Sequence, residues 1–141
     1  FVPMKTGYMV ADIMTQYVLT ASPDVNLHFC AKLMAEKKIG SLVIVDDGTI
    51  MGIITEQDLA RKVVAQGINP VNTLVSGYMS KPVITIAPDE DLYTAMVSMG
   101  NHNIKHLPVL KNKKMVGIIT FKDILKVEPA LIEKLWAKTE E

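Results

Sequence analysis

Gly52-Ile53-Ile54-Thr55-Glu56-Gln57-Asp58 returns 65 residues later as Gly117-Ile118-Ile119-Thr120-Phe121-Lys122-Asp123. At this offset the chain aligns with itself without a gap from about residue 10 to residue 63, and 15 of the 54 aligned pairs are identical. Similarity at a fixed spacing is typical of a duplicated structural unit. The sequence therefore predicts two tandem copies of one small unit.

Each copy shows the same order of predicted elements. A short helical lead-in precedes a β-branched strand, a Pro-Asp turn and an amphipathic helix, and a hairpin and a second helix follow. In the first copy we predict a lead-in at 11–14, strands at 18–21, 42–45 and 50–55, and a second helix from 56. In the second copy the lead-in is at 76–79, the strands are at 83–86, 107–110 and 115–120, and the second helix starts at 121.

The first helix of each copy carries a cap and one apolar face. Asn26 and Asp91 stand where an N-cap side chain would accept a backbone hydrogen bond. The apolar residues that follow recur at the spacing of a single buried helical stripe. In the first copy they are Leu27, Cys30, Ala31 and Met34, and in the second they are Leu92, Ala95, Met96 and Met99.

The fold class that this order predicts is mixed α/β (α+β), with two tandem β-α-β-β-α repeats. A unit of about 55 residues buries little apolar surface alone, so we expect the two copies to pack sheet to sheet with pseudo-twofold symmetry. The predicted boundaries are 8–66 for repeat 1, 67–73 for a linker, 74–128 for repeat 2 and 129–141 for a helical tail. The tail has apolar residues at helical spacing, namely Leu131, Ile132, Leu135 and Trp136.

Composition limits the kinds of partner. The 141 residues include 15 basic and 15 acidic side chains and are 49% hydrophobic, so the net charge of zero gives no footprint for nucleic acid or for a membrane surface. No apolar stretch approaches the roughly 20 residues that span a bilayer, and the N-terminus lacks a signal-peptide pattern. The single cysteine fits a reducing compartment, so we expect a cytoplasmic protein whose natural chain extends beyond Phe1.

The doubled Thr-x-x-Asp allows two interpretations. It matches a capping box, in which Thr caps the helix and the carboxylate reaches back to the backbone. Alternatively, the carboxylate of Asp58 or Asp123 could accept the two hydroxyl donors of a ribose diol, a role that suits a nucleoside sugar better than a lone phosphate. The residues alone leave both interpretations open.

The ordered set of motifs resembles CBS domains. In each copy a Pro-Asp turn, an Ile-x-x-Leu strand and a Gly-hydrophobic-hydrophobic-Thr-x-x-Asp motif follow in order, and the resemblance covers about residues 10–126. The resemblance implies an intertwined pair that binds AMP, ADP, ATP or S-adenosylmethionine in clefts between the repeats. It also implies that the Asp holds ribose hydroxyls, that the Thr contacts ribose or phosphate, and that residues of the opposite repeat hold adenine.

This resemblance assigns candidate residues to two clefts. We expect one cleft, named after Asp123, to be formed by Thr20, Ile39, Gly40, Lys105, His106, Thr120, Lys122 and Asp123. We expect the other cleft, named after Asp58, to be formed by Thr55, Asp58, Arg61, Thr85, Ile104 and Lys105.

The two clefts are expected to differ in charge. Lys105 and His106 precede the second strand of repeat 2, and the resemblance implies that basic residues there reach the phosphates of a ligand held by Asp123. Gly40 and Ser41 offer no such cation to Asp58, although Arg61 could compensate. The Asp123 cleft is therefore expected to favour AMP or ATP, while a solvated-loop role for Lys105 and His106 stays open.

Three function classes follow. The first is a regulatory module that senses an adenosine ligand and acts on an unknown effector protein, with a homodimer expected from the resemblance. The second is a ligand-free interaction scaffold, and the third is an enzyme. No catalytic motif occurs, and His28, Cys30, His102 and His106 lack the spacing of a metal site, so we expect no catalytic residues, no catalytic cofactor and no metal.

Overall fold

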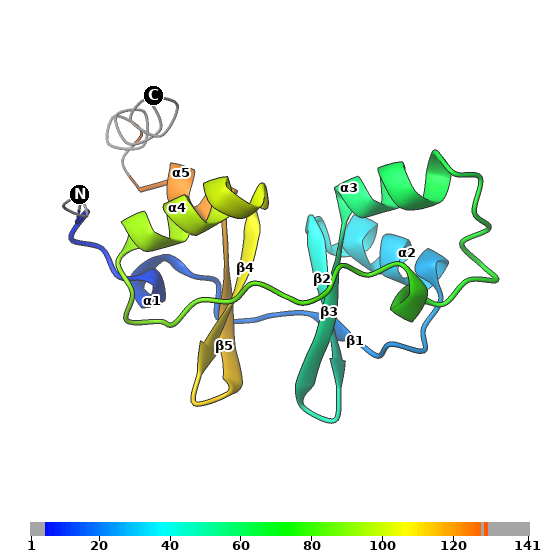
Figure 1. The fold of residues 1–141 in the computed structure, drawn as a ribbon, viewed down its shortest axis with the longest axis horizontal. Coiled ribbons are helices and arrows are strands. Elements are labelled where there is room, and N and C mark those ends of the chain that lie inside the picture. Colours follow the sequence, from blue (N-terminus) through cyan, green and yellow to red (C-terminus); the bar gives the residue numbers. More distant parts are fainter. Residues whose placement is uncertain (1–4, 128, 130–141) are drawn as a thin grey trace. The chain divides into compact units, whose positions relative to one another are not determined.

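The protein divides into two compact units, as the computed structural model in Figure 1 shows for residues 5–127 and residue 129. The β1–β3 unit is the continuous segment Leu19–Val83. The β4–β5 unit combines the chain up to Val18 with the chain from Ile84 onward. Each unit contains one sheet and several helices, which confirms the predicted mixed α/β fold class.

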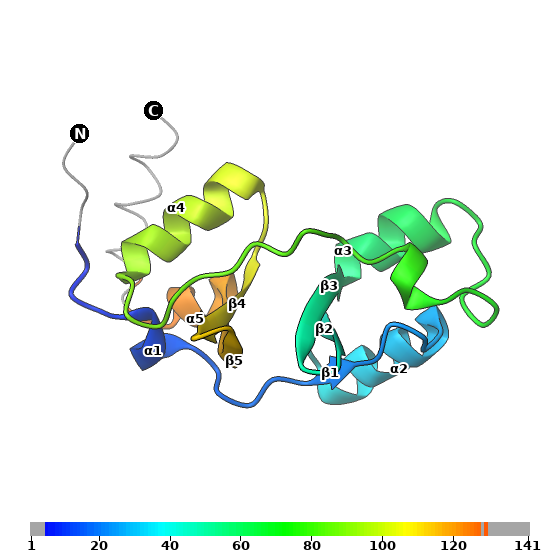
Figure 2. The ribbon, with the colours of Figure 1, turned by 60° about the horizontal axis from the view of Figure 1, so that its bottom comes forward.

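The β1–β3 unit holds a three-stranded sheet in the order β1-β2-β3. Strand β1 runs parallel to β2, and β2 and β3 form an antiparallel hairpin. Helix α2 and the helix that starts as α3 lie on one face of this sheet (Figures 1 and 2). The elements are β1 (Thr20–Ala21), α2 (Leu27–Lys37), β2 (Ser41–Asp46), β3 (Thr49–Thr55), α3 (Glu56–Asp58), a π-helical continuation (Leu59–Val64) and a 3₁₀ turn (Val75–Gly77).

The β4–β5 unit is built around a two-stranded antiparallel hairpin. Both predicted hairpins form, and each of their four strands extends the predicted one by no more than one residue at either end. The described elements are α1 (Val10–Ile13), α4 (Leu92–His102), β4 (His106–Lys111), β5 (Lys114–Thr120) and α5 (Phe121–Leu125).

The apolar stripes of α2 and α4 form the centres of the two cores, as predicted. On α4 all four predicted residues are buried, whereas on α2 Ala31 is only half-buried. Cys30 is fully buried in the stripe of α2, and this burial raises the pKa of its thiol to about 11. A thiol with that pKa is almost entirely protonated at neutral pH, which supports the prediction that Cys30 is a core residue.

The prediction of a strand at 83–86 is wrong, because these residues form no strand in the structure. In this segment only Ile86 pairs, through an isolated parallel bridge to Val109. The matching segment of repeat 1 does form a strand, β1, in which Thr20 pairs with Val43. Repeat 2 has Pro108 in place of Val43, and because proline has no N–H to donate, the ladder loses one hydrogen bond at that position.

The lead-in segments are exchanged between the repeats. Helix α1 begins repeat 1 but lies beside the hairpin of repeat 2, where Thr15 exchanges two 2.9 Å backbone hydrogen bonds with Ile118 (Figures 1 and 2). In the same way, Ser80 is near the start of repeat 2 but exchanges backbone hydrogen bonds of 2.8 and 3.1 Å with Ile53 of repeat 1. The packed units and the predicted boundaries therefore divide the chain differently.

The segment predicted as a linker, 67–73, is hydrogen-bonded into the β1–β3 unit. The backbone N–H groups of Leu27 and His28 donate to the carbonyls of Thr73 and Pro70 at 2.9 and 3.1 Å. These bonds satisfy donors at the start of α2 that have no partner within the helix. The predicted helical tail, 129–141, lies outside the described residues except for Pro129.

Candidate ligand-binding sites

Both Thr-x-x-Asp motifs form capping boxes. The N–H groups of Thr55 and Thr120 each donate to Oδ2 of the following Asp at 3.0 Å. In return, the N–H groups of Asp58 and Asp123 donate to the Thr hydroxyl oxygens at 3.1 and 3.2 Å. The capping-box interpretation of the motif is therefore confirmed in both copies. Any ligand must bind to the carboxylate acceptor positions that the capping hydrogen bonds leave unoccupied.

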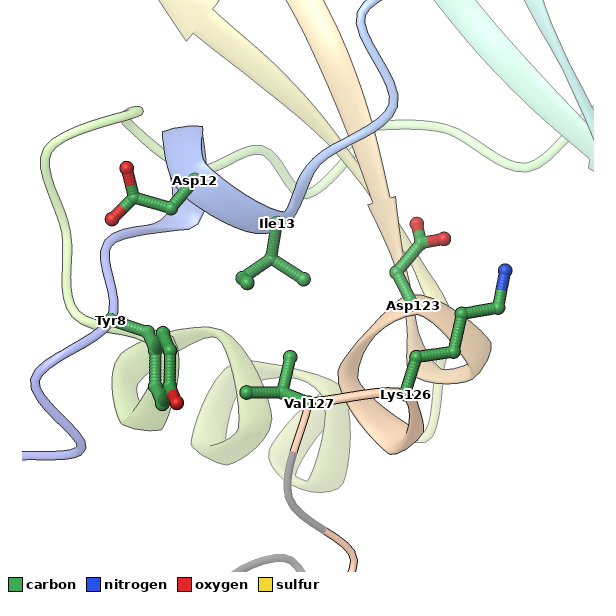
Figure 3. A pocket seen from close by; sticks show the side chains of 6 residues that line it. All are labelled: Tyr8, Asp12, Ile13, Asp123, Lys126 and Val127. Atoms are coloured by element: carbon green, nitrogen blue, oxygen red, sulfur yellow. The ribbon is translucent and has the colours of Figure 1, made fainter.

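Asp123 lines an open pocket of about 470 Å³ in the β4–β5 unit. Figure 3 shows Asp123 on α5 and Lys126 directly after it, with the side chains of Tyr8, Ile13 and Val127 around the pocket. Within the described part of the chain, Asp123 makes side-chain hydrogen bonds only through Oδ2 and has no ion pair. Oδ1 is thus available at a pocket that also contains apolar walls and a cation.

Asp58 has a more crowded environment. Lys62 Nζ lies 3.2 Å from Asp58 Oδ1, and the Ser80 hydroxyl donates to the same carboxylate at 3.4 Å. Lys62 also donates to Ser80 Oγ at 3.1 Å, so the three side chains form one cluster. The two carboxylates share a motif but differ in how many of their acceptor positions are occupied.

The residues before each second strand lie next to the helix of their own repeat. The N–H of Phe121 donates to the carbonyl of Lys105 at 2.9 Å, and that of Glu56 donates to the carbonyl of Gly40 at 3.1 Å. His106 pairs with Thr120 in the hairpin. The backbone of Lys105 and His106 therefore lies beside the start of α5, and the role of their side chains stays a prediction.

The other candidate residues can be placed only within their own units. Thr20, Arg61, Thr85 and Lys122 are exposed, whereas Ile39 and Ile104 pack against the two hydrophobic cores. Thr20, Ile39 and Gly40 belong to the β1–β3 unit and Asp123 to the β4–β5 unit, while Thr85, Ile104 and Lys105 are in the opposite unit from Asp58. Each predicted cleft combines residues of both units, so the composition of both clefts stays a prediction.

Sequence reasoning missed several residues around the two carboxylates. At the Asp123 pocket these are Tyr8, Asp12, Ile13, Lys126 and Val127, and at Asp58 they are Lys62 and Ser80. Two signals were present in the sequence. Lys62 stands four residues after Asp58, on the same helical face, and Lys126 is the repeat counterpart of Arg61.

The described residues include no helix that is long and apolar enough to cross a membrane. Over the same residues, no group of three or more His, Cys, Asp or Glu side chains is arranged to hold a metal ion.

Comparison with known proteins supports this interpretation. An uncharacterized protein of Methanopyrus kandleri is 42% identical over 125 residues, which are 87% of this chain and 64% of that protein. The CBS domain pair of protein MJ0100, solved with 5′-methylthioadenosine and S-adenosyl-L-methionine, has a TM-score of 0.78 and 32% identity over 85% of this chain and 94% of its own. A hexameric CBS-CP12 protein from bloom-forming cyanobacteria has a TM-score of 0.79 and 31% identity over 90% and 74%.

The family match itself covers both repeats. The CBS domain family matches residues 10–65 and 75–130, which together make up most of the chain. These ranges agree with the duplication and contain both Thr-x-x-Asp motifs. CBS domain pairs are regulatory, ligand-binding modules. The chain therefore belongs to the CBS domain family and contains a pair of CBS domains.

Proposed function

We propose that this protein senses an adenosine-containing ligand, with Asp123 holding the ribose hydroxyls. The observation that carries the proposal is that Asp123 lines the pocket while only its Oδ2 accepts a hydrogen bond, for the helix cap, within the described part of the chain. A carboxylate has about four lone-pair sites, so it can cap the helix and still accept two hydroxyl donors. The capping and ligand-binding interpretations are thus compatible.

The pocket suits a nucleoside in size and chemistry. Its volume of about 470 Å³ lies within the range of roughly 300–1,000 Å³ that is common for small-molecule sites. Tyr8, Ile13 and Val127 supply apolar contact surface for a base, and Lys126 supplies positive charge beside Asp123. The complex of MJ0100 with two adenosine compounds supports this ligand class, and AMP, ADP and ATP are also proposed.

Asp123→Asn is expected to abolish ligand stabilisation. We would measure thermal unfolding with AMP, ADP, ATP, NAD, S-adenosylmethionine and 5′-methylthioadenosine. A ligand at 100 times its dissociation constant adds about 2.7 kcal/mol to the stability of the wild type, which raises the midpoint by several degrees. Asparagine keeps an oxygen for the Thr120 N–H but removes the charge that attracts the diol.

The control ligand is 2′,3′-dideoxyadenosine, which keeps the base and lacks both hydroxyls. We expect it to give no shift with either protein. If no adenosine compound shifts the midpoint of folded wild-type protein, the sensor proposal is wrong, and an interaction scaffold without a ligand becomes the better description.

A finer proposal is that Lys105 contacts the phosphate of a nucleotide bound at Asp123. Lys105 is exposed and its carbonyl is bonded to the start of α5, close to Asp123. We expect Lys105→Ala to weaken AMP by about tenfold, the effect of losing one charge-assisted hydrogen bond, and to leave 5′-methylthioadenosine unchanged. Isothermal titration would measure both. Lys111→Ala, at the exposed hairpin turn, is the matched control, and equal losses for the two ligands would contradict a phosphate role.

We propose that occupancy changes the conformation of the protein or of an assembly, and that this change reaches an effector protein. A ligand can shift such an equilibrium only as far as its affinities for the two states differ. The proposed assembly is a homodimer, and the proposed role is regulatory and without catalysis, in the cytoplasm. Light scattering with and without ligand would separate a dimer from larger assemblies.

A further inference from the structure

The acceptor positions of Asp58 are mostly occupied by the protein itself. The carboxylate accepts from the Thr55 N–H at 3.0 Å, from Lys62 at 3.2 Å and from the Ser80 hydroxyl at 3.4 Å. Three donors on about four lone-pair sites leave room for about one more. A ribose diol brings two donors, so it cannot bind to this carboxylate without displacing one of the present partners.

Lys62 covers the solvent-facing side of the Asp58 carboxylate. Its side chain is 44% exposed, whereas that of Asp58 is 13% exposed, so the ammonium reaches the carboxylate from the solvent side. The ammonium is also held by the Ser80 hydroxyl at 3.1 Å and by the Tyr78 carbonyl at 3.5 Å. Ser80 and Tyr78 belong to the exchanged lead-in, which therefore fixes Lys62 over the carboxylate.

Repeat 2 lacks this arrangement. The residue that corresponds to Lys62 is Val127, which lines the Asp123 pocket and carries no charge. The residue that corresponds to Arg61 is Lys126, so both repeats have a cation three residues after the Asp. At the fourth position after the Asp, the two sites therefore differ by a basic residue, which only repeat 1 has.

We propose that Lys62 determines the specificity of the Asp58 site by acting as an internal counter-ion that excludes ribose diols from the carboxylate. This proposal rests on the proposed function, because it assumes that Asp123 binds such a diol. With Lys62 in place, the chain binds one adenosine ligand, at Asp123. Without Lys62, the Asp58 carboxylate keeps the Thr55 N–H and the Ser80 hydroxyl as donors and has about two acceptor positions left, enough to bind a second diol.

The test uses 5′-methylthioadenosine, which has the ribose diol but no phosphate that a lysine could attract. On an Asp123→Asn background, Lys62→Met is expected to tighten binding by about tenfold, the effect of freeing one acceptor from a charge-assisted hydrogen bond. Methionine keeps the length of the side chain and removes the charge. Isothermal titration gives the affinity, and Lys32→Met, at an exposed position on α2, is the matched control.

The reciprocal change tests the same idea at the other site. Val127→Lys in the otherwise unchanged protein is expected to weaken binding at Asp123 by about tenfold, and Val127→Met separates charge from bulk. If Lys62→Met leaves the affinity of the Asp123→Asn protein unchanged, while the wild type binds through Asp123, the proposal for Lys62 is overturned and the proposed function stands. No binding by the wild type or by any folded variant overturns both.

Discussion

Gly117→Ala is expected to lower the free energy of unfolding by about 2–3 kcal/mol, the upper part of the range for overpacking a core. A Cβ atom at Gly117 would lie 2.7 Å from Met14 Sδ and 2.8 Å from the Thr15 carbonyl oxygen. That carbonyl accepts from the Ile118 N–H at 2.9 Å, so the backbone cannot move away without breaking the bond. Urea denaturation would measure the loss.

Gly52→Ala supplies the matched comparison in repeat 1 and is expected to cost only about 1 kcal/mol. There the nearest atoms, at 2.5–3.1 Å, all belong to the side chain of Met79, which can change its rotamer. Met79→Ala should therefore relieve part of the cost of Gly52→Ala, whereas Met14→Ala leaves the Thr15 carbonyl in place beside Gly117. Equal costs for the two glycine variants would show that the backbone contact is unimportant.

The contacts of Gly117 and Gly52 separate what the sequence could predict from what it could not. The repeat alignment placed Met14 with Met79 and Gly52 with Gly117, and it predicted a lead-in, a hairpin and a capped helix in each copy. These features depend on local spacing and turn chemistry, which a sequence displays directly. The seating of each methionine against the glycine of the other repeat depends on long-range packing, which the alignment could not display.

The candidate site shows the same division. The Thr caps were one of two interpretations of the motif that the sequence left open, and it offered them because a capping box is a local motif. Arg61 was predicted to supply charge at Asp58, but the basic residue that contacts the carboxylate is Lys62. The sequence could not rank the two, because positions three and four after an Asp both lie on its helical face. Ser80, from the exchanged lead-in, holds Lys62 in place.

Asp91 ties the N-terminal segment to α4, and Asp91→Ala is expected to lower the free energy of unfolding by about 2 kcal/mol at pH 7. The carboxylate accepts from the Tyr93 N–H at 2.8 Å, as the N-cap of α4. It also accepts from the N–H and the hydroxyl of Thr6, both at 3.0 Å, and from the Gly7 N–H at 3.3 Å. The variant loses a helix cap and the anchor of the segment that leads into α1.

The loss should depend on pH. Desolvation by burial raises the pKa of Asp91, but the hydrogen bonds from Tyr93, Thr6 and Gly7 outweigh it and hold the pKa below its usual value. A group with a lowered folded-state pKa contributes stability above its unfolded value, about 3.9 for Asp, and loses it as the pH falls through the folded value. The gap between wild type and Asp91→Ala should therefore be full at pH 7 and shrink below about pH 4.

Repeat 1 provides the control at the corresponding position. Asn26 caps α2 by accepting from the Phe29 N–H at 2.7 Å, and its amide does not titrate in this range. Asn26→Ala is expected to cost about 1 kcal/mol, with the same value at pH 7 and at pH 3.5. Urea denaturation of both variants across this range separates a charged cap from a neutral one. A gap for Asp91→Ala that stays constant to pH 3 would mean that hydrogen-bond geometry, and not the carboxylate charge, holds the N-terminal segment on α4.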